Sequence, residues 1–242
     1  MTKPIVDQSI FKGVDMSSTQ LSREVELIRK AISDALRADD PTQPGTTIGK
    51  AKAGIYAFFD FDGEPIYVGQ TAEQFSARLG RHLTGMRSDS VAKFVLDPFE
   101  VYAVSMWSLP QVAALPQKER RSRLDVYEYK VHSLLAQQSK FGAVLNEGTI
   151  VPQEDIEDLP DPVTVVIVPD EIFAERSHPD VRIARRAQTI SLLARHISER
   201  KVSKGLRRTL LVQSERLQDL AARRSAALAG TDDPAEAEVA ED

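Results

Sequence analysis

The sequence predicts an α+β protein in which a small antiparallel β-sheet is flanked by helices, with an N-terminal helix before it and a basic helical C-terminal extension after it. Residues 53–60 and 65–70 are β-branched and aromatic runs on either side of Asp62-Gly63. This dipeptide favours a tight hairpin because Gly adopts positive φ without steric cost. Apolar residues recur at helical spacing before and after the two runs. With 242 residues and 42% apolar content, the chain can bury one sizeable core.

Residues 18–38 are predicted to form an amphipathic helix, and residues 39–49 a linker. The apolar residues of this helix recur at helical spacing, at Leu21, Val25, Ile28, Ile32 and Leu36. Such a stripe covers the core or a partner subunit. We therefore assign residues 1–49 to an N-terminal helix and linker.

Two further runs are predicted to extend the sheet. In residues 99–106, alternation places Phe99, Val101 and Ala103 on one face of a third strand. Residues 163–168 form an apolar run that predicts one more buried strand. The domain built on this sheet is assigned to residues 50–170.

A helix is predicted directly after the hairpin, because Thr71 and Gln74 have the spacing of a capping box. Its buried stripe consists of apolar residues at i, i+4 and i+8, namely Phe75, Leu79 and Leu83. Arg78, Arg81 and His82 stand on a neighbouring face. Guanidinium and imidazole groups in such a cluster can hold a phosphate, and the alternative is a solvated basic helix face.

A second helix is predicted from residue 117 to residue 139. Glu128 lies in its apolar stripe, together with Leu124, Val131 and Leu135. A carboxylate facing the core must be paired, protonated or bound to a cation, and Arg78 and a divalent metal are the candidates. The alternative is a carboxylate at the edge of the stripe that bends out to water. Asn146 follows the helix and brings an amide side chain close to the expected sheet.

Taken in order, these motifs resemble the signature of the GIY-YIG nuclease superfamily. The matching positions are Gly54-Ile55-Tyr56, Tyr67-Val68-Gly69, Arg78 with His82, Glu128, and Asn146. The resemblance covers roughly residues 50–148, and Val68 replaces the Ile of the family name. The Arg-x-x-x-His spacing is most similar to the restriction-endonuclease branch of the superfamily.

The resemblance implies a catalytic set for phosphodiester hydrolysis. Tyr56 is expected at the attacking water, with Tyr67 in the same network and His82 as an accessory base. A phenol with an unperturbed pKa of about 10 needs a lowered pKa or a proton relay to act as a base near neutrality. Whether Tyr56 or His82 takes the proton first is left open by the sequence. Arg78 is expected to clamp the phosphate oxygens.

The resemblance also implies a metal cofactor. Glu128 is the expected protein ligand of a single divalent cation, Mg²⁺ with Mn²⁺ as a substitute, because Mg²⁺ is often held by one carboxylate plus water and phosphate oxygens. Asn146 is expected to orient the phosphate or the metal-bound water. The implied products carry a 5′ phosphate and a 3′ hydroxyl.

Charge is segregated along the chain, although the net charge of −5 is unusual for a DNA-binding protein. Residues 176–228 hold 13 Lys and Arg against 4 Asp and Glu. We assign residues 171–229 to a basic helical extension, with Gly205 as the candidate break between two helices. Together with Arg81, the residues expected to contact DNA are Arg185, Arg186, Arg195, Arg200, Lys201, Lys204, Arg207 and Arg208. The alternatives are a solvated helix face and arginines that pair with the acidic body. Residues 230–242 form an acidic tail that is predicted to be disordered.

Composition excludes several other classes of protein. The chain has no Cys, so disulfides, thiolate zinc sites and Cys nucleophiles are absent. No apolar run approaches the length of about 18 residues that a membrane span needs, and no secretion signal is recognisable, so we expect a cytoplasmic protein without membrane partners.

The sequence leaves three functions in contention. The leading one is a Mg²⁺-dependent, sequence-specific restriction-type endonuclease that cuts double-stranded DNA as a homodimer. The second is a GIY-YIG nuclease of repair, homing or phage defence with structure or strand specificity. The third is a nucleic-acid-binding module whose catalytic centre is retired.

Overall fold

The computed structural model describes residues 18–83, 97–145 and 159–229. Its strands form one antiparallel sheet in the order β2-β1-β3-β4. The strands are β1 (Gly54–Phe59), β2 (Pro65–Thr71), β3 (Ala103–Ser108) and β4 (Val163–Val166). The helices are α1 (Ser18–Ala35), α2 (Phe75–Leu83), α4 (Pro110–Ala113), α5 (Gln117–Gln138), α6 (Asp170–Ser177), α7 (Pro179–Glu199) and α8 (Lys204–Ala229). Short 3₁₀ turns are η2 (Ile48–Lys50) and η3 (Pro98–Glu100). The predicted α+β class is confirmed.

The β1–β2 hairpin is confirmed, with Tyr56 opposite Gly69 in the register. The turn depends on Asp60, whose Oδ1 accepts hydrogen bonds from the backbone amides of Asp62 and Glu64. Gly63 adopts a φ of 76°, which is the left-handed conformation that the Asp-Gly dipeptide predicted.

The third strand differs from the prediction. Residues 98–100 form the 3₁₀ turn η3, because the Asp97 side chain accepts a hydrogen bond from the Phe99 amide and Pro98 favours a turn. Strand β3 starts later, at Ala103, and pairs with β1. The predicted fourth strand forms, because β4 pairs with β3 and extends the sheet. It is not the buried strand that the apolar run predicted, because β4 lies at the sheet edge and its residues are half-buried or exposed.

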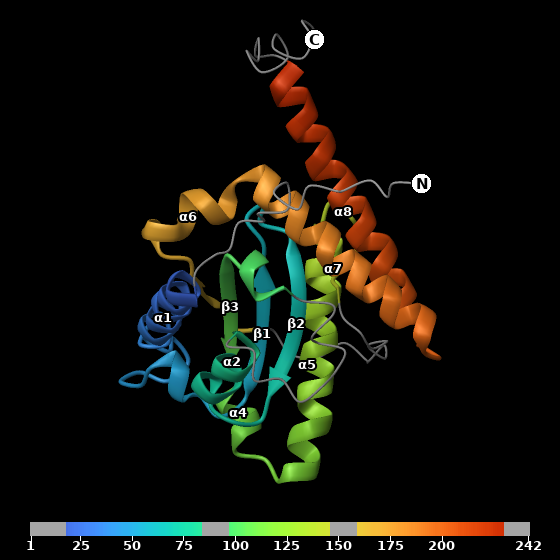
Figure 1. Ribbon diagram of the computed structural model, residues 1–242. Helices are drawn as coiled ribbons and strands as arrows, with labels where there is room; N and C mark the ends of the chain where they lie inside the picture. The colour runs from blue at the N-terminus through green and yellow to red at the C-terminus, as the bar shows by residue number, and fades with distance from the viewer. Residues whose placement is uncertain (1–17, 84–96, 146–158, 230–242) are drawn as a thin grey trace, which may run out of the picture.

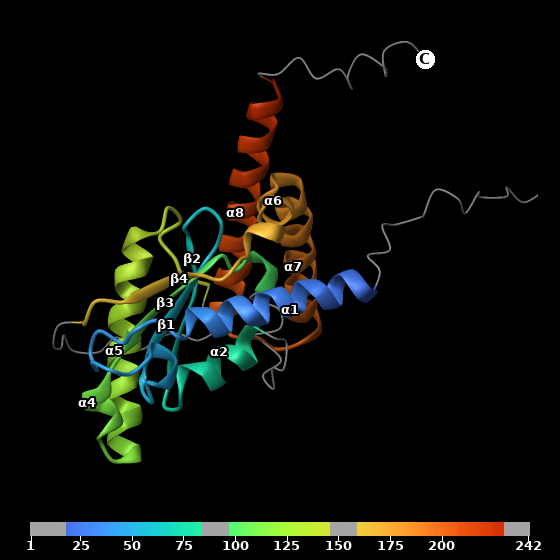
Figure 2. The same cartoon turned by 90° about the vertical axis from the view of Figure 1, so that its left-hand side faces the viewer.

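Each face of the sheet is covered by its own helices (Figures 1 and 2). On one face, Ile55, Ala57 and Val68 pack against Leu124, Tyr127 and Val131 of α5, in one apolar cluster. On the other face, the cluster contains buried residues of α1, α2, α7 and α8 around Tyr56 and Phe58. The predicted N-terminal helix and the helix after the hairpin therefore lie opposite α5.

The segment predicted to be a linker is a structured part of the body. Asp40 is 2% exposed and accepts hydrogen bonds from Thr42 and from the Ser108 hydroxyl, the latter at 2.7 Å. Asp39 and Thr47 form a β-bridge, and η2 follows. A buried carboxylate that satisfies several donors fixes this segment, which composition alone does not reveal.

The basic extension forms α6, α7 and α8, and α7 packs along α8 at the hairpin-turn end of the sheet (Figure 1). The break between α7 and α8 lies at residues 200–203, before Gly205, which lies in the first turn of α8. The last turns of α8 project beyond the rest of the described residues (Figure 2). No helix in the described ranges combines the length and apolar content that crossing a bilayer requires.

Candidate active site

The two tyrosines of the hairpin lie together, and both motif glycines are sterically required beside them. Tyr56 is fully buried, and the centroids of the Tyr56 and Tyr67 rings are 6.1 Å apart. A Cβ on Gly69 would lie 2.6 Å from the Tyr56 Oη and 2.7 Å from the Tyr67 Cε1. A Cβ on Gly54 would overlap the Trp107 carbonyl oxygen and the Phe75 ring. Any side chain at these glycines would displace the rings.

Arg78 reaches the tyrosines from α2. The stripe of Phe75, Leu79 and Leu83 is buried as predicted, which turns Arg78 toward β1. Its Nε donates to the Tyr56 Oη at 3.2 Å. The guanidinium makes no other hydrogen bond within the described residues, so its remaining N–H groups can bind a further acceptor.

The start of α2 differs from the predicted capping box. The Thr71 hydroxyl bonds to the Glu73 carbonyl and accepts from the Glu73 amide, and the helix begins at Phe75. Glu73 pairs with Arg81. The charge of Arg81, a predicted DNA contact, is therefore partly compensated in this structure.

Glu128 lies on α5, half-buried, beside the edge strand β2. The amide nitrogen of Gln70 donates to Asp125 Oδ1 at 2.6 Å and to Glu128 Oε2 at 3.1 Å. One amide thus holds two carboxylates that stand three residues apart on the helix. The other end of this amide, Gln70 Oε1, is buried and has no hydrogen-bond partner within the described residues.

Burial sets the protonation of the two central groups. Burial, together with the neighbouring Asp125 charge, raises the pKa of Glu128 to about 7, against the smaller effects of Gln70 and Arg78. Burial also raises the pKa of Tyr56, outweighing the charge of Arg78 and the hydrogen bonds from Arg78 and Tyr67. Tyr56 therefore keeps its proton at neutral pH, and the lowered phenol pKa that a base would need is not produced by its protein neighbours.

This arrangement fits a magnesium ion better than a metal held entirely by protein. No three His, Cys, Asp or Glu side chains within the described ranges gather as a metal group. Mg²⁺ keeps several waters and needs only one or two carboxylates, which Glu128 and Asp125 can supply. The neighbouring carboxylates of Asp125 and Glu128 form a suitable pair of oxygen donors, and the Gln70 amide nitrogen holds them in place.

An open groove runs past these residues. It is lined by Gln70, Glu73, Arg78, Lys118, Arg121 and Asp125, which come from β2, the turn after it, α2 and the first half of α5. We call Tyr56, Tyr67, Gln70, Arg78, Asp125 and Glu128 the groove cluster. Arg78 and the two carboxylates thus come from helices on opposite faces of the sheet and lie near the edge strand β2.

Two predicted catalytic residues cannot be placed. The backbone of His82 lies in α2, but its side chain is outside the described part of the structure. Asn146 lies outside the described residues altogether, as does the acidic tail. Their roles remain predictions.

The predicted DNA contacts of the extension fall into two groups. Exposed side chains are those of Arg195, Arg200, Lys201, Lys204, Arg207 and Arg208. Arg195 pairs with Glu199 on the surface. Arg185 pairs with Asp97 and stacks on the Phe99 ring.

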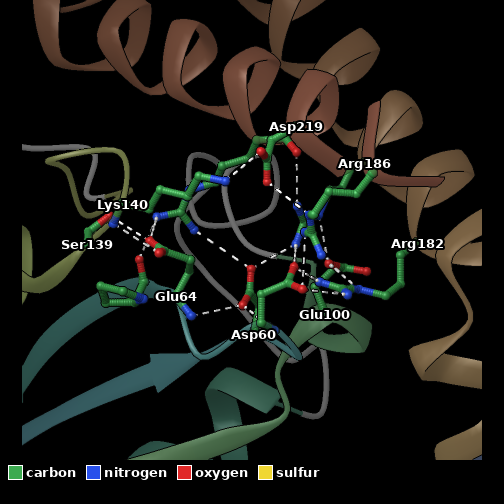
Figure 3. Close-up of polar contacts among 12 residues, drawn as sticks. Asp60, Glu64, Glu100, Ser139, Lys140, Arg182, Arg186 and Asp219 are labelled. Carbon is green, nitrogen blue, oxygen red and sulfur yellow. Dashed lines mark hydrogen bonds and ion pairs between the residues drawn. The ribbon is translucent and has the colours of Figure 1, made fainter. Parts of the chain in front are cut away.

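The assignment of Arg186 to DNA is corrected by its burial. Arg186 is 6% exposed and donates to Asp60 at 2.8 Å and to Glu100 at 2.9 Å. Figure 3 shows Arg182 and Arg186 reaching from the helices toward Asp60 and Glu100. Arg186 therefore pairs with carboxylates of the body, which is the alternative that the sequence left open.

These contacts belong to a larger cluster at the hairpin turn. Arg216, which is 1% exposed, donates to the carbonyl oxygens of Pro65 and Ala143. We call this cluster the turn network; it consists of Asp60, Asp62, Glu64, Glu100, Arg182, Arg186 and Arg216. It joins α7 and α8 to the sheet.

Sequence reasoning missed two members of the groove cluster, Gln70 and Asp125. Gln70 directly follows the Tyr67-Val68-Gly69 motif, and strand alternation from Val68 places it on the α5 side. Asp125 precedes Glu128 by three residues, so helical spacing puts both on one face. Both positions could be read from the sequence, but only the contact between β2 and α5 shows that the two side chains meet.

Comparison with protein-family models, with curated proteins and with solved structures finds no match for this chain. The residues of the groove cluster are therefore the only basis in the described part of the chain for assigning a function.

Proposed function

We propose that this protein is a Mg²⁺-dependent endonuclease that hydrolyses phosphodiester bonds in double-stranded DNA and leaves 5′-phosphate and 3′-hydroxyl ends. The observation that carries the proposal is the Arg78 Nε hydrogen bond to Tyr56 Oη at the groove that Gln70 and Asp125 also line. Residues that are far apart in the sequence meet where a phosphate, a water and a cation must meet in this reaction.

Arg78 supplies charge to the scissile phosphate. Its Nε donates a hydrogen bond to the Tyr56 hydroxyl, and this bond fixes the plane of the guanidinium. The remaining N–H groups bind the non-bridging phosphate oxygens and stabilise the negative charge that develops in the transition state.

Tyr56 positions the attacking water rather than removing its proton. Its raised pKa keeps the phenol neutral, and Tyr67 and Arg78 hold its ring and hydroxyl in place. The water's proton passes to an acceptor of lower pKa, for which His82 is the candidate from the sequence. The departing 3′ oxygen takes a proton from water in the open groove.

Glu128 and Asp125 would hold the Mg²⁺ ion, which supplies charge neutralisation at the phosphate and lowers the pKa of the attacking water when it is bound. Gln70 keeps the two carboxylates in position through its amide nitrogen. Residues in this supporting role typically change activity about 10- to 100-fold when they are removed.

The restriction-type assignment rests on Arg78 with His82 four residues later on α2. Cutting both strands of a symmetric site calls for two active centres related by a two-fold axis, so a homodimer on DNA belongs to this proposal.

The test is to incubate the purified protein and Mg²⁺ with a mixed-sequence duplex library and to sequence the cut ends. Discrete ends with a common sequence support the restriction-type enzyme. Nicks confined to added flaps or branches support a nuclease of repair, homing or defence type. A library that binds but stays uncut with Mg²⁺ and Mn²⁺ at every salt concentration contradicts the nuclease and supports a retired binding module.

A further inference from the structure

One face of α5 carries polar residues in a single row beside its buried stripe. Arg121, Asp125, Glu128 and His132 stand at i, i+4, i+7 and i+11, so they share one side of the helix. The hydrogen bonds from Gln70 to Asp125 and Glu128 show that this side faces the edge strand β2. The reaction centre therefore lies in the middle of the row.

The start of the row lies in the groove. Lys118 and Arg121 line the groove together with Arg78 and Asp125, and both side chains are exposed. Neither has an ion-pair or hydrogen-bond partner within the described residues. Arg120 differs, because its guanidinium donates to the carbonyl oxygens of Ala113 and Leu115 and closes the loop before α5.

The end of the row approaches the basic turn between α7 and α8. His132 is half-buried, and its pKa is lowered by burial first and by the charge of Arg208 second. The end of α5 lies near α8, because Lys140, just after α5, pairs with Asp219 of α8 at 2.6 Å, and the charge of the exposed Arg208 acts on His132 from the start of α8. Its basic neighbours across the turn are also exposed, at Arg200, Lys201, Lys204 and Arg207.

The row thus has positive charge at both ends and carboxylates between them. An α-helix rises 1.5 Å per residue, so Arg121 lies about 10 Å before Glu128, and His132 about 6 Å after it, along the axis. One DNA strand advances about 3.4 Å per nucleotide. The two ends of the row therefore lie about two to three nucleotides from the bond at Glu128, with positive charge from Arg121 at one end and from Arg208 at the other.

We propose that this row, with Lys118 and Arg121 at its start and Arg208 at its end, is a phosphate track that holds the backbone of the DNA strand being cut on both sides of the scissile bond. The inference deepens the proposed nuclease function and rests on it. It assigns Lys118 and Arg121 to DNA, which charge segregation along the sequence did not single out.

The test is the salt dependence of DNA binding, measured by fluorescence anisotropy with a labelled mixed-sequence duplex in EDTA. Each lost phosphate contact reduces the slope of log K against log salt concentration by about 0.9. We expect a reduction of about 1.8 for the Lys118→Ala/Arg121→Ala double variant and about 0.9 for Arg208→Ala. Arg121→Lys should keep the wild-type slope, because the charge is retained.

Arg29→Ala is the matched control. Arg29 is an exposed arginine on α1, which contacts β4 at the opposite edge of the sheet from β2. Its slope should equal that of the wild type. A slope that changes equally in Arg29→Ala and in the track variants overturns the track, because binding would then follow total charge. Unchanged slopes in the track variants, or a wild type that does not bind duplex at low salt, overturn it as well.

The binding assay in EDTA needs no turnover, so it separates the two proposals. Wild-type protein that shows track-dependent slopes but leaves DNA uncut with Mg²⁺ keeps the track and removes the nuclease. Wild-type protein that cuts DNA while the variant slopes stay unchanged keeps the nuclease and removes the track.

Discussion

Arginine and carboxylate side chains gather at both ends of the β1–β2 hairpin, in the turn network at one end and in the groove cluster at the other. The two clusters differ in how their charges are compensated. In the turn network, every carboxylate lies within ion-pair distance of at least one arginine. In the groove cluster, Glu128 and Asp125 lie beside each other and share one neutral amide. The first arrangement holds helices onto a sheet, whereas the second leaves charge that a cation can neutralise.

The pKa shifts express the same difference. The pKa of Asp62 is lowered, because the Arg182 hydrogen bond and the charges of Arg182, Arg223 and Arg186 together outweigh the opposing effect of burial. The pKa of Glu128 is raised to about 7 by burial and by Asp125. Pairing does not always lower the pKa of a carboxyl group: burial raises the pKa of Glu100 although Arg186 and Arg182 lie beside it. A carboxylate whose pKa lies near 7 beside a groove is a candidate functional residue. Such a raised pKa does not stabilise the fold, so stability does not explain why the carboxylate is there.

Removing the groove arginine should have the largest effect on activity. Arg78→Ala removes the donor to Tyr56 and the charge at the phosphate, and we expect cleavage to fall about 1000-fold. Arg78→Lys should recover little of it, because an ammonium group lacks the planar fork. Single-turnover cleavage rates measure this. Arg37→Ala, in the turn after α1, is the control. Equal losses in both arginine variants would contradict the role of Arg78.

Removing the buried turn arginine should instead reduce stability. Arg216→Ala takes the arginine away from Glu64 and removes the donor to the carbonyl oxygens of Pro65 and Ala143. Breaking a buried pair costs about 3–5 kcal/mol of unfolding free energy. The corresponding fall in melting temperature is about 10 °C. Arg223→Ala is the control, because this side chain is half-exposed and its pairs with Asp62 and Asp219 contribute little. A thermal midpoint that does not move in Arg216→Ala would show that the turn network does not hold the fold.

The glycine between the tyrosines offers a smaller, steric test. Gly69→Ala places a Cβ against the Tyr56 and Tyr67 rings, and overpacking of this kind costs about 1–3 kcal/mol. We expect a lower denaturation midpoint together with reduced cleavage. Gly80→Ala is the matched control on α2, where an added Cβ meets no atom within 4 Å and helix propensity favours Ala. If Gly69→Ala behaves like Gly80→Ala in both assays, the ring arrangement is wrong.

The smallest effect concerns the pH dependence of the turn network. Because the folded pKa of Asp62 lies below its ordinary value of 3.8, its contribution to stability is present above that pH and is lost as pH falls through the folded pKa. The free energy of unfolding of the wild type should exceed that of Asp62→Asn by about 1 kcal/mol at pH 6. This difference should shrink below about pH 4. Urea midpoints at pH 6, 4 and 3 measure this. Asp161→Asn, at an exposed position, should show no such dependence; a constant difference for Asp62→Asn would contradict the pairing.

Local patterns were enough to predict the hairpin and the helices α2 and α5. The apolar runs around Asp62-Gly63 placed Tyr56 and Tyr67 in the hairpin, and only the family resemblance singled them out as site residues. Glu128 stood out because a carboxylate interrupted an apolar stripe. The start of β3 was predicted too early, because the Asp97 cap and Pro98 turned the chain before the strand. The GIY-YIG identity itself stays a prediction.

The turn network could not be predicted from the sequence, because its pairs join positions about a hundred residues apart. Nothing near Arg182, Arg186 or Arg216 distinguishes them from the exposed arginines around them. Their burial is decided by Asp60 and Glu100, which lie on other elements. The same holds for Asp40, whose partner Ser108 comes from β3. Hydrophobic periodicity along the sequence predicts which face of a helix or strand is buried. Buried ion pairs depend in addition on which faces of different elements pack together in the fold.

The most direct test of the contrast between the two clusters is to measure the cleavage rate and the thermal midpoint of Glu128→Ala in one preparation, beside the wild type. The account predicts that cleavage of duplex DNA with Mg²⁺ falls about 1000-fold, while the thermal midpoint in EDTA does not fall, because removing Glu128 relieves a pair of neighbouring carboxylates. Cleavage that survives the substitution, or a melting temperature that falls as far as in Arg216→Ala, would contradict it.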